Sequence, residues 1–226
     1  MTLLLARHGN TFAPGEPARR VGARTDLPLV AEGRAQAERL AAQLAAEGIV
    51  PARIVAGPLA RTREFAAILA ARLGGTVALD DRLRELDYGT WEGLEDAAIA
   101  ARDAAALAAW ERRLEWPAAA GWGEGEATVL ARLRGVLDDA AAGPLPLLAV
   151  TSNGILRLLR RLIEGPPPAG EGYKVRTGAL CRLRRAPDPA GARPDGLRPG
   201  AGGWHIAAWD ERPPVTGPAP AGAARP

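Results

Sequence analysis

Short apolar runs alternate along the chain with longer segments of helical character. Runs at residues 2–6, 53–56, 76–79 and 147–151 are typical of buried strands. Helices are expected between and after them, at residues 31–47, 59–73, 94–114, 124–142 and 155–163. In the first of these helices Ala37, Leu40, Ala41 and Leu44 share one face, as in a helix that packs on a core. The pattern predicts packed layers of strands and helices.

The last quarter of the chain has a different pattern. Residues 179–184 and 204–208 are expected to form two more strands, paired as a hairpin across a long loop rich in proline and glycine. From residue 213 onward proline, alanine and glycine dominate, which predicts a disordered tail. We therefore expect one domain over residues 1–212 and a tail over residues 213–226.

Strands that alternate with helices predict an α/β fold, here a three-layer sandwich with a mostly parallel central sheet and helices on both faces. In such sheets, ligands bind at the carboxyl ends of the strands. Three of the expected strands end in turns that contain polar residues or glycine. These turns are residues 7–9 (Arg-His-Gly), residues 57–58 (Gly-Pro) with Arg61 soon after, and residues 152–154 (Ser-Asn-Gly). We expect the three turns to converge on one site.

Composition excludes several other classes of protein. The 226 residues are 47% hydrophobic and 24% charged, as in globular domains and unlike disordered chains. The pI of 9.7 rests on an excess of only three positive charges, and no recognition motif accompanies it, so we expect no nucleic-acid partner. Arg19, Arg20 and Arg24 cluster in the expected loop after the first strand, where they either attract an anionic substrate or are simply solvated.

The sequence also predicts the cellular compartment of the protein. Cys181 is the single cysteine and cannot form an internal disulfide, which fits a reducing compartment. The first residues show no basic segment followed by an apolar stretch, so no signal peptide is expected. No apolar run approaches the ~18 residues that a membrane span needs. We expect a cytoplasmic protein without a membrane partner.

His8 is the strongest candidate for chemistry. It is one of two histidines in the chain and directly follows the first expected strand. A lone histidine there can simply cap a strand, but this one has polar and flexible neighbours. Gly9 lets the backbone approach a ligand closely, and Asn10 and Thr11 add polar groups. The adjacent Arg7, together with Arg61, offers guanidinium groups that suit phosphate oxygens.

At this point the sequence resembles the histidine phosphatase superfamily, also called the phosphoglycerate mutase-like family. Residues 7–11 (RHGNT) are similar to its signature motif. Residues 57–62 (GPLART) resemble its Ser-Pro-Leu-x-Arg-Ala block, and residues 83–93 (LRELDYGTWEG) are the most specific match after the signature. The resemblance covers residues 2–162.

The resemblance implies a mechanism and its residues. His8 would attack phosphorus and carry the phosphoryl group as phosphohistidine. Arg7 and Arg61 would clamp the phosphate, with Asn10 and Thr11 beside them. Glu85 would protonate the leaving oxygen and later deprotonate the attacking water. The mechanism needs no metal and no other cofactor, and the sequence contains no cluster with metal-ligand spacing.

The sequence departs from the family pattern at the end of the fourth strand. The family has Val-Ser-His-Gly-Gly there, followed by an arginine five residues after the histidine. Counting back from Arg157 puts Ser152 in the position of that second histidine. Ser152 and Asn153 are expected to donate hydrogen bonds to the phosphoryl group in its place, at the start of a helix. The loss of this potential positive charge leaves three interpretations open: catalysis is slower, the site is specialised, or the site binds a ligand without catalysing a reaction.

We therefore expect a phosphatase that hydrolyses a small-molecule phosphomonoester. A mutase is less favoured, because the mutase branch has serine where Thr11 stands and Trp-Asn where Ala13 and Pro14 stand. The alternative from another class is a catalytically impaired member that binds a phosphorylated ligand. The sequence leaves the substrate and the oligomeric state open.

Overall fold

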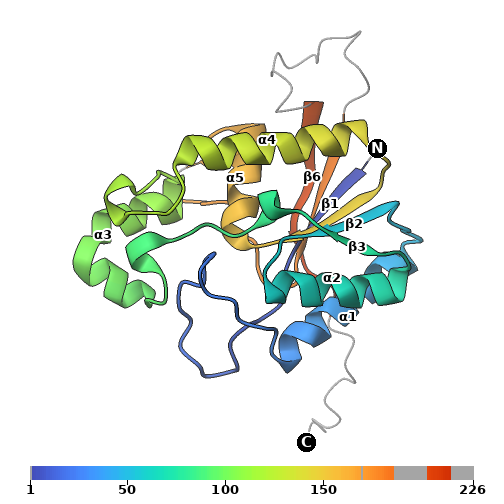
Figure 1. The fold of residues 1–226 in the computed structure, drawn as a ribbon, viewed down its shortest axis with the longest axis horizontal. Coiled ribbons are helices and arrows are strands. Elements are labelled where there is room, and N and C mark those ends of the chain that lie inside the picture. Colours follow the sequence, from blue (N-terminus) through green and yellow to red (C-terminus); the bar gives the residue numbers. More distant parts are fainter. Residues whose placement is uncertain (1, 169, 186–202, 215–226) are drawn as a thin grey trace, which may run out of the picture.

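The computed structural model describes residues 2–168, 170–185 and 203–214. Most of the expected loop between the last two strands, and the expected tail beyond residue 214, lie outside the described residues. Within the described part, the chain forms one central sheet with helices on both of its faces (Figure 1).

The sheet has six strands in the order β3-β2-β4-β1-β5-β6. Their bounds are β1 (Thr2–Arg7), β2 (Arg53–Ala56), β3 (Val77–Leu79), β4 (Leu147–Thr151), β5 (Leu180–Arg185) and β6 (Trp204–Glu211). The pairs β1–β4, β2–β4 and β2–β3 are parallel, whereas β5 runs antiparallel to β1 and β6. The expectation of a mostly parallel sheet with a terminal hairpin is confirmed.

The described residues form five α-helices: α1 (Ala31–Ala46), α2 (Ala60–Leu73), α3 (Asp96–Arg113), α4 (Glu126–Ala142) and α5 (Asn153–Glu164). Helices α1 and α2 lie on one face, and α4 and α5 lie on the other (Figure 1). Strand β1 shows why both faces need cover. Leu4 and Ala6 belong to the core under α1 and α2, and Leu3 and Leu5 belong to the opposite core. An unbroken apolar run is what a strand buried on both faces requires.

The carboxyl ends of β1, β2 and β4 meet at one edge of the sheet. The N–H of His8 donates to the carbonyl of Thr151 at 3.0 Å, and the N–H of Gly57 donates to the carbonyl of Val150 at 3.0 Å. The three turns expected to converge therefore do so.

A cluster of aromatic rings supports the segment that follows η1 (Asp81–Leu83). The ring of Trp122 meets those of Tyr88, Trp91, Trp110 and Trp116 edge to face, with centroids 4.7–5.6 Å apart. These contacts join α3 and the 115–125 segment to residues 85–91. Of the five rings, only that of Tyr88 lines the cavity described below.

No helix in the described part of the chain combines the length and the apolar character that a membrane span needs.

Candidate active site

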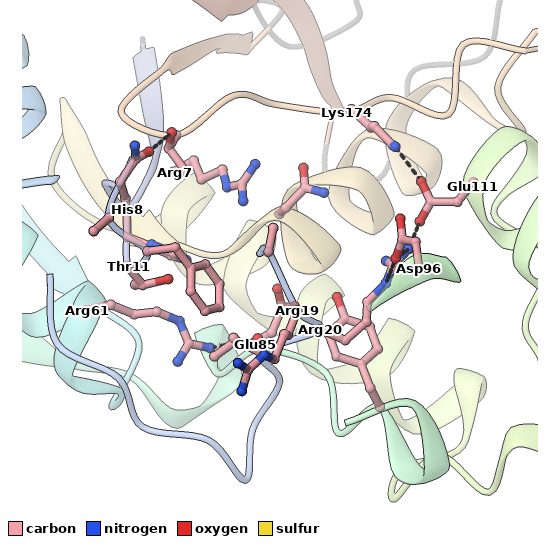
Figure 2. A pocket seen from close by; sticks show the side chains of 18 residues that line it. Arg7, His8, Thr11, Arg19, Arg20, Arg61, Glu85, Asp96, Glu111 and Lys174 are labelled. Atoms are coloured by element: carbon pink, nitrogen blue, oxygen red, sulfur yellow. Dashed lines mark hydrogen bonds and ion pairs between the residues drawn. The ribbon is translucent and has the colours of Figure 1, made fainter. Parts of the chain in front are cut away.

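A cavity of about 540 Å³ opens where the three strand ends meet. Seven of the eight predicted site residues line it: Arg7, His8, Asn10, Thr11, Arg61, Glu85 and Asn153. Figure 2 shows His8, Arg7 and Arg61 together at one end, and Asp96, Glu111 and Lys174 at the other. Ser152 is the one predicted residue that does not line the cavity.

His8 is held as a neutral imidazole with a defined tautomer. Its side chain is buried, and Nδ1 lies 2.8 Å from the carbonyl oxygen of Gly9. Because a carbonyl only accepts, Nδ1 carries the proton and Nε2 keeps its lone pair. Burial lowers the pKa of His8 well below its ordinary value, and the nearby Arg61 and Arg7 lower it further. A neutral ring with an unprotonated Nε2 is the form that can act as a nucleophile.

Two glycines let the loop after β1 reach this position. A Cβ on Gly9 would lie 2.3 Å from the carbonyl oxygen of Gly33, and a Cβ on Gly33 would lie 2.3 Å from that of Asn10. The backbone of this loop therefore packs directly on the first turn of α1, where any side chain would collide.

The guanidinium groups of Arg7 and Arg61 donate from Nη atoms to backbone carbonyls, and their Nε atoms have no hydrogen-bond partner within the described residues. Arg7 donates from Nη1 to the carbonyl of Val175 at 2.5 Å. Arg61 donates from Nη1 to the carbonyl of Thr25 at 2.8 Å and from Nη2 to Gly22 at 3.1 Å. Within the described residues, the Nε atom of each is buried without a hydrogen-bond partner. A cationic donor without a partner is chemically suited to bind an anion.

The electrostatics of both arginines follow from burial. Burial lowers the pKa of Arg7 and of Arg61, and the carboxylate of Glu85 opposes that effect at both. Both groups still carry a full positive charge, because an arginine does not lose its proton in proteins. An anion bound between them would replace part of the hydration that they lost on folding.

Glu85 is buried and held by two backbone donors. The N–H of Leu86 donates to Oε1 at 2.9 Å, and the N–H of Gly154 donates to Oε2 at 3.2 Å. The side chain lines the cavity with both arginines. A carboxyl group fixed beside a phosphate site can move a proton to or from a bound oxygen.

Two amide side chains complete the wall beside His8. Oδ1 of Asn10 accepts from Gln36 Nε2 at 3.2 Å and from Thr177 Oγ1. Oδ1 of Asn153 accepts from the N–H of Val175 at 3.0 Å. In both cases the oxygen is occupied, which leaves the NH₂ group to donate to a ligand. The contacts of Gln36 and Thr177 with Asn10 had no signal in the sequence, because the three residues come from distant segments.

Ser152 lies behind the cavity wall and not in it. It is fully buried at the start of α5, and its Oγ atom has no hydrogen-bond partner within the described residues. Its carbonyl accepts the N–H of Leu156, the first hydrogen bond of the helix. The helix begins at Asn153, two residues earlier than expected, so the turn presents Asn153 to the cavity and directs Ser152 inward.

The other end of the cavity carries a chain of ion pairs (Figure 2). Arg20 lies 2.5 Å from Glu111 and 2.8 Å from Asp96, and Lys174 lies 2.6 Å from Glu111. Burial would raise the pKa of Glu111, but Arg20, Arg157 and Lys174 together lower it to about 2. Arg19 also lines the cavity, whereas Arg24 does not. Nothing in the sequence singled out Asp96, Glu111 or Lys174.

Within the described residues, no group of three or more His, Cys, Asp or Glu side chains is placed to hold a metal ion.

Comparisons with known proteins identify the family of this chain. A family model described as the histidine phosphatase superfamily (branch 1) matches residues 3–191. Proteins named "Probable phosphoglycerate mutase GpmB" from Yersinia enterocolitica and Cronobacter sakazakii are each 30% identical over 189 residues, which cover 81% of this chain and 84% of theirs.

Solved structures show the same fold. One called mycobacterial hydrolase 2 superposes with a TM-score of 0.77 at 27% identity, covering 95% of this chain and 92% of its own. A mycobacterial glucosyl-3-phosphoglycerate phosphatase superposes with a TM-score of 0.72 at 26% identity, covering 93% of this chain and 99% of its own. The matched family model spans most of the chain and includes the residues that surround His8, so the chain belongs to the histidine phosphatase superfamily.

Proposed function

We propose that this protein is a phosphatase that hydrolyses a small phosphomonoester through a phosphohistidine intermediate at His8. The observation that carries the proposal is the state of His8. It is a buried, neutral imidazole whose Nδ1–H is bound to the Gly9 carbonyl, and it lines the same cavity as two guanidinium groups with unpaired Nε atoms. A nucleophile beside an anion site is what phosphoryl transfer to histidine needs.

In the first step, Nε2 of His8 forms a bond to phosphorus while the bond from phosphorus to the ester oxygen breaks. Arg7 and Arg61 hold the non-bridging oxygens and stabilise the charge that spreads over them. Asn10, Thr11 and Asn153 donate further hydrogen bonds. Glu85 gives its proton to the departing oxygen, so the leaving group departs as a neutral alcohol.

In the second step, a water molecule attacks phosphorus and the bond to Nε2 breaks. Glu85 takes the proton that the water loses, which restores both the acid and the free imidazole. Inorganic phosphate then leaves. In this scheme Ser152 contributes no contact, because its side chain is buried outside the cavity.

The names of similar proteins support hydrolysis and keep a mutase as the second candidate. The mycobacterial neighbour is called a phosphatase, while the bacterial relatives are called probable phosphoglycerate mutases. A mutase would return the phosphoryl group from His8 to another hydroxyl group and not to water. Incubation with 3-phosphoglycerate distinguishes the two, since a mutase makes the 2-phosphate isomer and a phosphatase does not.

The test of the proposal is a comparison of the two histidines. His8→Ala is expected to abolish turnover of p-nitrophenyl phosphate and to leave no acid-labile phosphohistidine after rapid quenching. His205→Gln, in β6 and outside the cavity, serves as the matched control and is expected to retain both. Full turnover by His8→Ala would refute the covalent mechanism. A wild-type protein that binds phosphate but never becomes phosphorylated would favour the impaired, ligand-binding alternative.

A reducing, cytoplasmic location is part of the same proposal. Cys181 is a free, buried thiol in β5, and burial raises its pKa to about 12. A thiol in this state is protonated and unreactive at neutral pH, so it acts as a small apolar side chain in the core.

A further inference from the structure

The end of the cavity away from His8 is built from three separate segments. Arg19 and Arg20 come from the loop after β1, Asp96 and Glu111 from α3, and Lys174 from the loop after α5. In the proposed reaction, this end surrounds the alcohol part of the phosphomonoester, since Arg7, Arg61 and His8 hold the phosphoryl group at the other end (Figure 2). Its chemistry therefore selects the leaving group.

A second anionic group on the substrate fits poorly here. Two of the cations at this end are already neutralised, Arg20 by Asp96 and Glu111, and Lys174 by Glu111, while Arg19 is exposed to solvent, which screens its charge. A carboxylate or a second phosphate would have to approach these fixed carboxylates, and like charges brought together cost several kcal/mol. The pKa of Glu111, about 2, means that this carboxylate is charged at neutral pH. It can accept hydrogen bonds and cannot donate them.

A cationic group on the substrate fits no better. Five positive residues line the whole cavity, namely Arg7, Arg19, Arg20, Arg61 and Lys174, against the three negative residues Glu85, Asp96 and Glu111. The lining thus has an excess of two positive charges. This excess is larger still when Glu85 holds the proton that it donates in the first step, so an ammonium group on the substrate is disfavoured.

Hydroxyl groups carry no charge and can pair with both the carboxylates and the cations at this end of the cavity. A hydroxyl donates to a carboxylate such as Asp96 or Glu111 and accepts from a cation such as Arg20 or Lys174. The alternating donors and acceptors are held in place by their own ion pairs before a ligand arrives, which lowers the cost of ordering them. A cavity of about 540 Å³ is within the range of small-molecule sites.

Building on the proposed phosphatase function, we propose that the substrate is a monophosphate of a neutral polyhydroxylated alcohol, such as a sugar or polyol phosphate. Asp96, Glu111, Arg20 and Lys174 are then the residues that determine specificity. Substrates with a second negative charge or with an ammonium group are selected against.

The experiment compares two pairs of substrates, and the two members of each pair differ only in whether one group is charged. Glycerol 3-phosphate and 3-phosphoglycerate differ only in a CH₂OH group against a carboxylate. Ethylene glycol phosphate and phosphoethanolamine differ only in a hydroxyl against an ammonium group. We expect kcat/KM to favour the hydroxyl compound in both pairs, at least about tenfold in the first. Equal or reversed preference in the first pair would overturn the proposal.

A matched pair of variants tests which residues cause the preference for glycerol 3-phosphate over 3-phosphoglycerate. Asp96 is 61% exposed and Asp139, on α4 and outside the cavity, is 60% exposed, and each forms an ion pair with an arginine. Asp96→Asn is expected to reduce the preference for glycerol 3-phosphate over 3-phosphoglycerate several-fold, whereas Asp139→Asn leaves the ratio unchanged. If Asp96→Asn leaves the ratio of the two kcat/KM values unchanged, Asp96 does not contribute to specificity. If Glu111→Gln leaves this ratio unchanged as well, the assignment of the specificity site is wrong.

Failure of the proposed phosphatase function is visible separately. Hydrolysis of p-nitrophenyl phosphate reports the phosphoryl-transfer chemistry without any polyol. If it is absent, the two Kd values for glycerol 3-phosphate and 3-phosphoglycerate, measured by calorimetry on the intact protein, still test the preference. Tighter binding of glycerol 3-phosphate supports the proposal, and equal or weaker binding contradicts it.

Discussion

Gly154 and Glu85 lie in direct contact although they are 69 positions apart in the chain. The N–H of Gly154 donates to Oε2 of Glu85 at 3.2 Å, and a Cβ on Gly154 would lie 2.5 Å from Oε1. The first turn of α5 therefore positions the carboxyl group that we assign as the general acid. Only glycine leaves room for that carboxyl group and still supplies the backbone donor.

Gly154→Ala is accordingly expected to displace Glu85 from the leaving oxygen. A general acid matters most when the departing oxygen is basic, so turnover of an alkyl phosphate is expected to fall at least tenfold more than that of p-nitrophenyl phosphate. Glu85→Gln is expected to show the same pattern. Gly135→Ala, inside α4, is the control and is expected to alter neither substrate's turnover. Equal losses on both esters in Gly154→Ala would mean that Glu85 does not protonate the leaving group.

Arg61→Lys is expected to weaken inhibition by vanadate or phosphate about tenfold or more, because a lysine keeps the charge but loses the planar fork. The same change also removes the anchors from Arg61 to the carbonyls of Thr25 and Gly22. Arg72→Lys, on the exposed side of the same helix, is the control. Inhibition constants that stay equal to the wild-type value in Arg61→Lys would place the phosphate elsewhere.

Ser152→Ala is expected to keep turnover and phosphate affinity within about twofold of the wild-type values. It removes a buried hydroxyl that has no hydrogen-bond partner within the described residues, so the free energy of unfolding is expected to stay constant or rise by about 1 kcal/mol. Asn153→Ala, one position further on, is expected to weaken phosphate binding. A tenfold loss of turnover in Ser152→Ala would show that its hydroxyl reaches the phosphoryl group.

The protonation of His8 predicts how stability depends on pH. In the unfolded chain His8 takes up a proton below about pH 6.5, while the folded chain resists it because its pKa is lowered. The unfolded state therefore binds more protons, and the free energy of unfolding falls as the pH drops below that value, by at most about 1.4 kcal/mol per pH unit. Denaturant unfolding of the wild type and of His8→Gln between pH 7 and 5 measures this. Parallel curves for the two proteins would contradict a buried, neutral His8.

Much of the fold was predictable from local patterns. The run at residues 2–6 predicted a buried strand, and β1 is that strand, buried on both faces. Strand β6 is longer than expected, since it extends to Glu211 where the pattern ended at residue 208. The reason is a tertiary one, because the polar residue Glu211 pairs with Arg182 on the neighbouring strand.

The sequence by itself determined the inner half of the candidate site. Arg7 ends an apolar strand and His8 directly follows it. Because the carboxyl ends of parallel strands meet at one edge of the sheet, the sequence pattern was enough to predict that these two residues converge with Arg61 and Asn153. Tertiary structure alone decided which of Ser152 and Asn153 faces the cavity, because that depends on the residue at which α5 begins. It also decided the outer half, where Asp96, Glu111 and Lys174 meet from segments with no shared pattern. Their ion pairs form only when the folded chain brings these segments together.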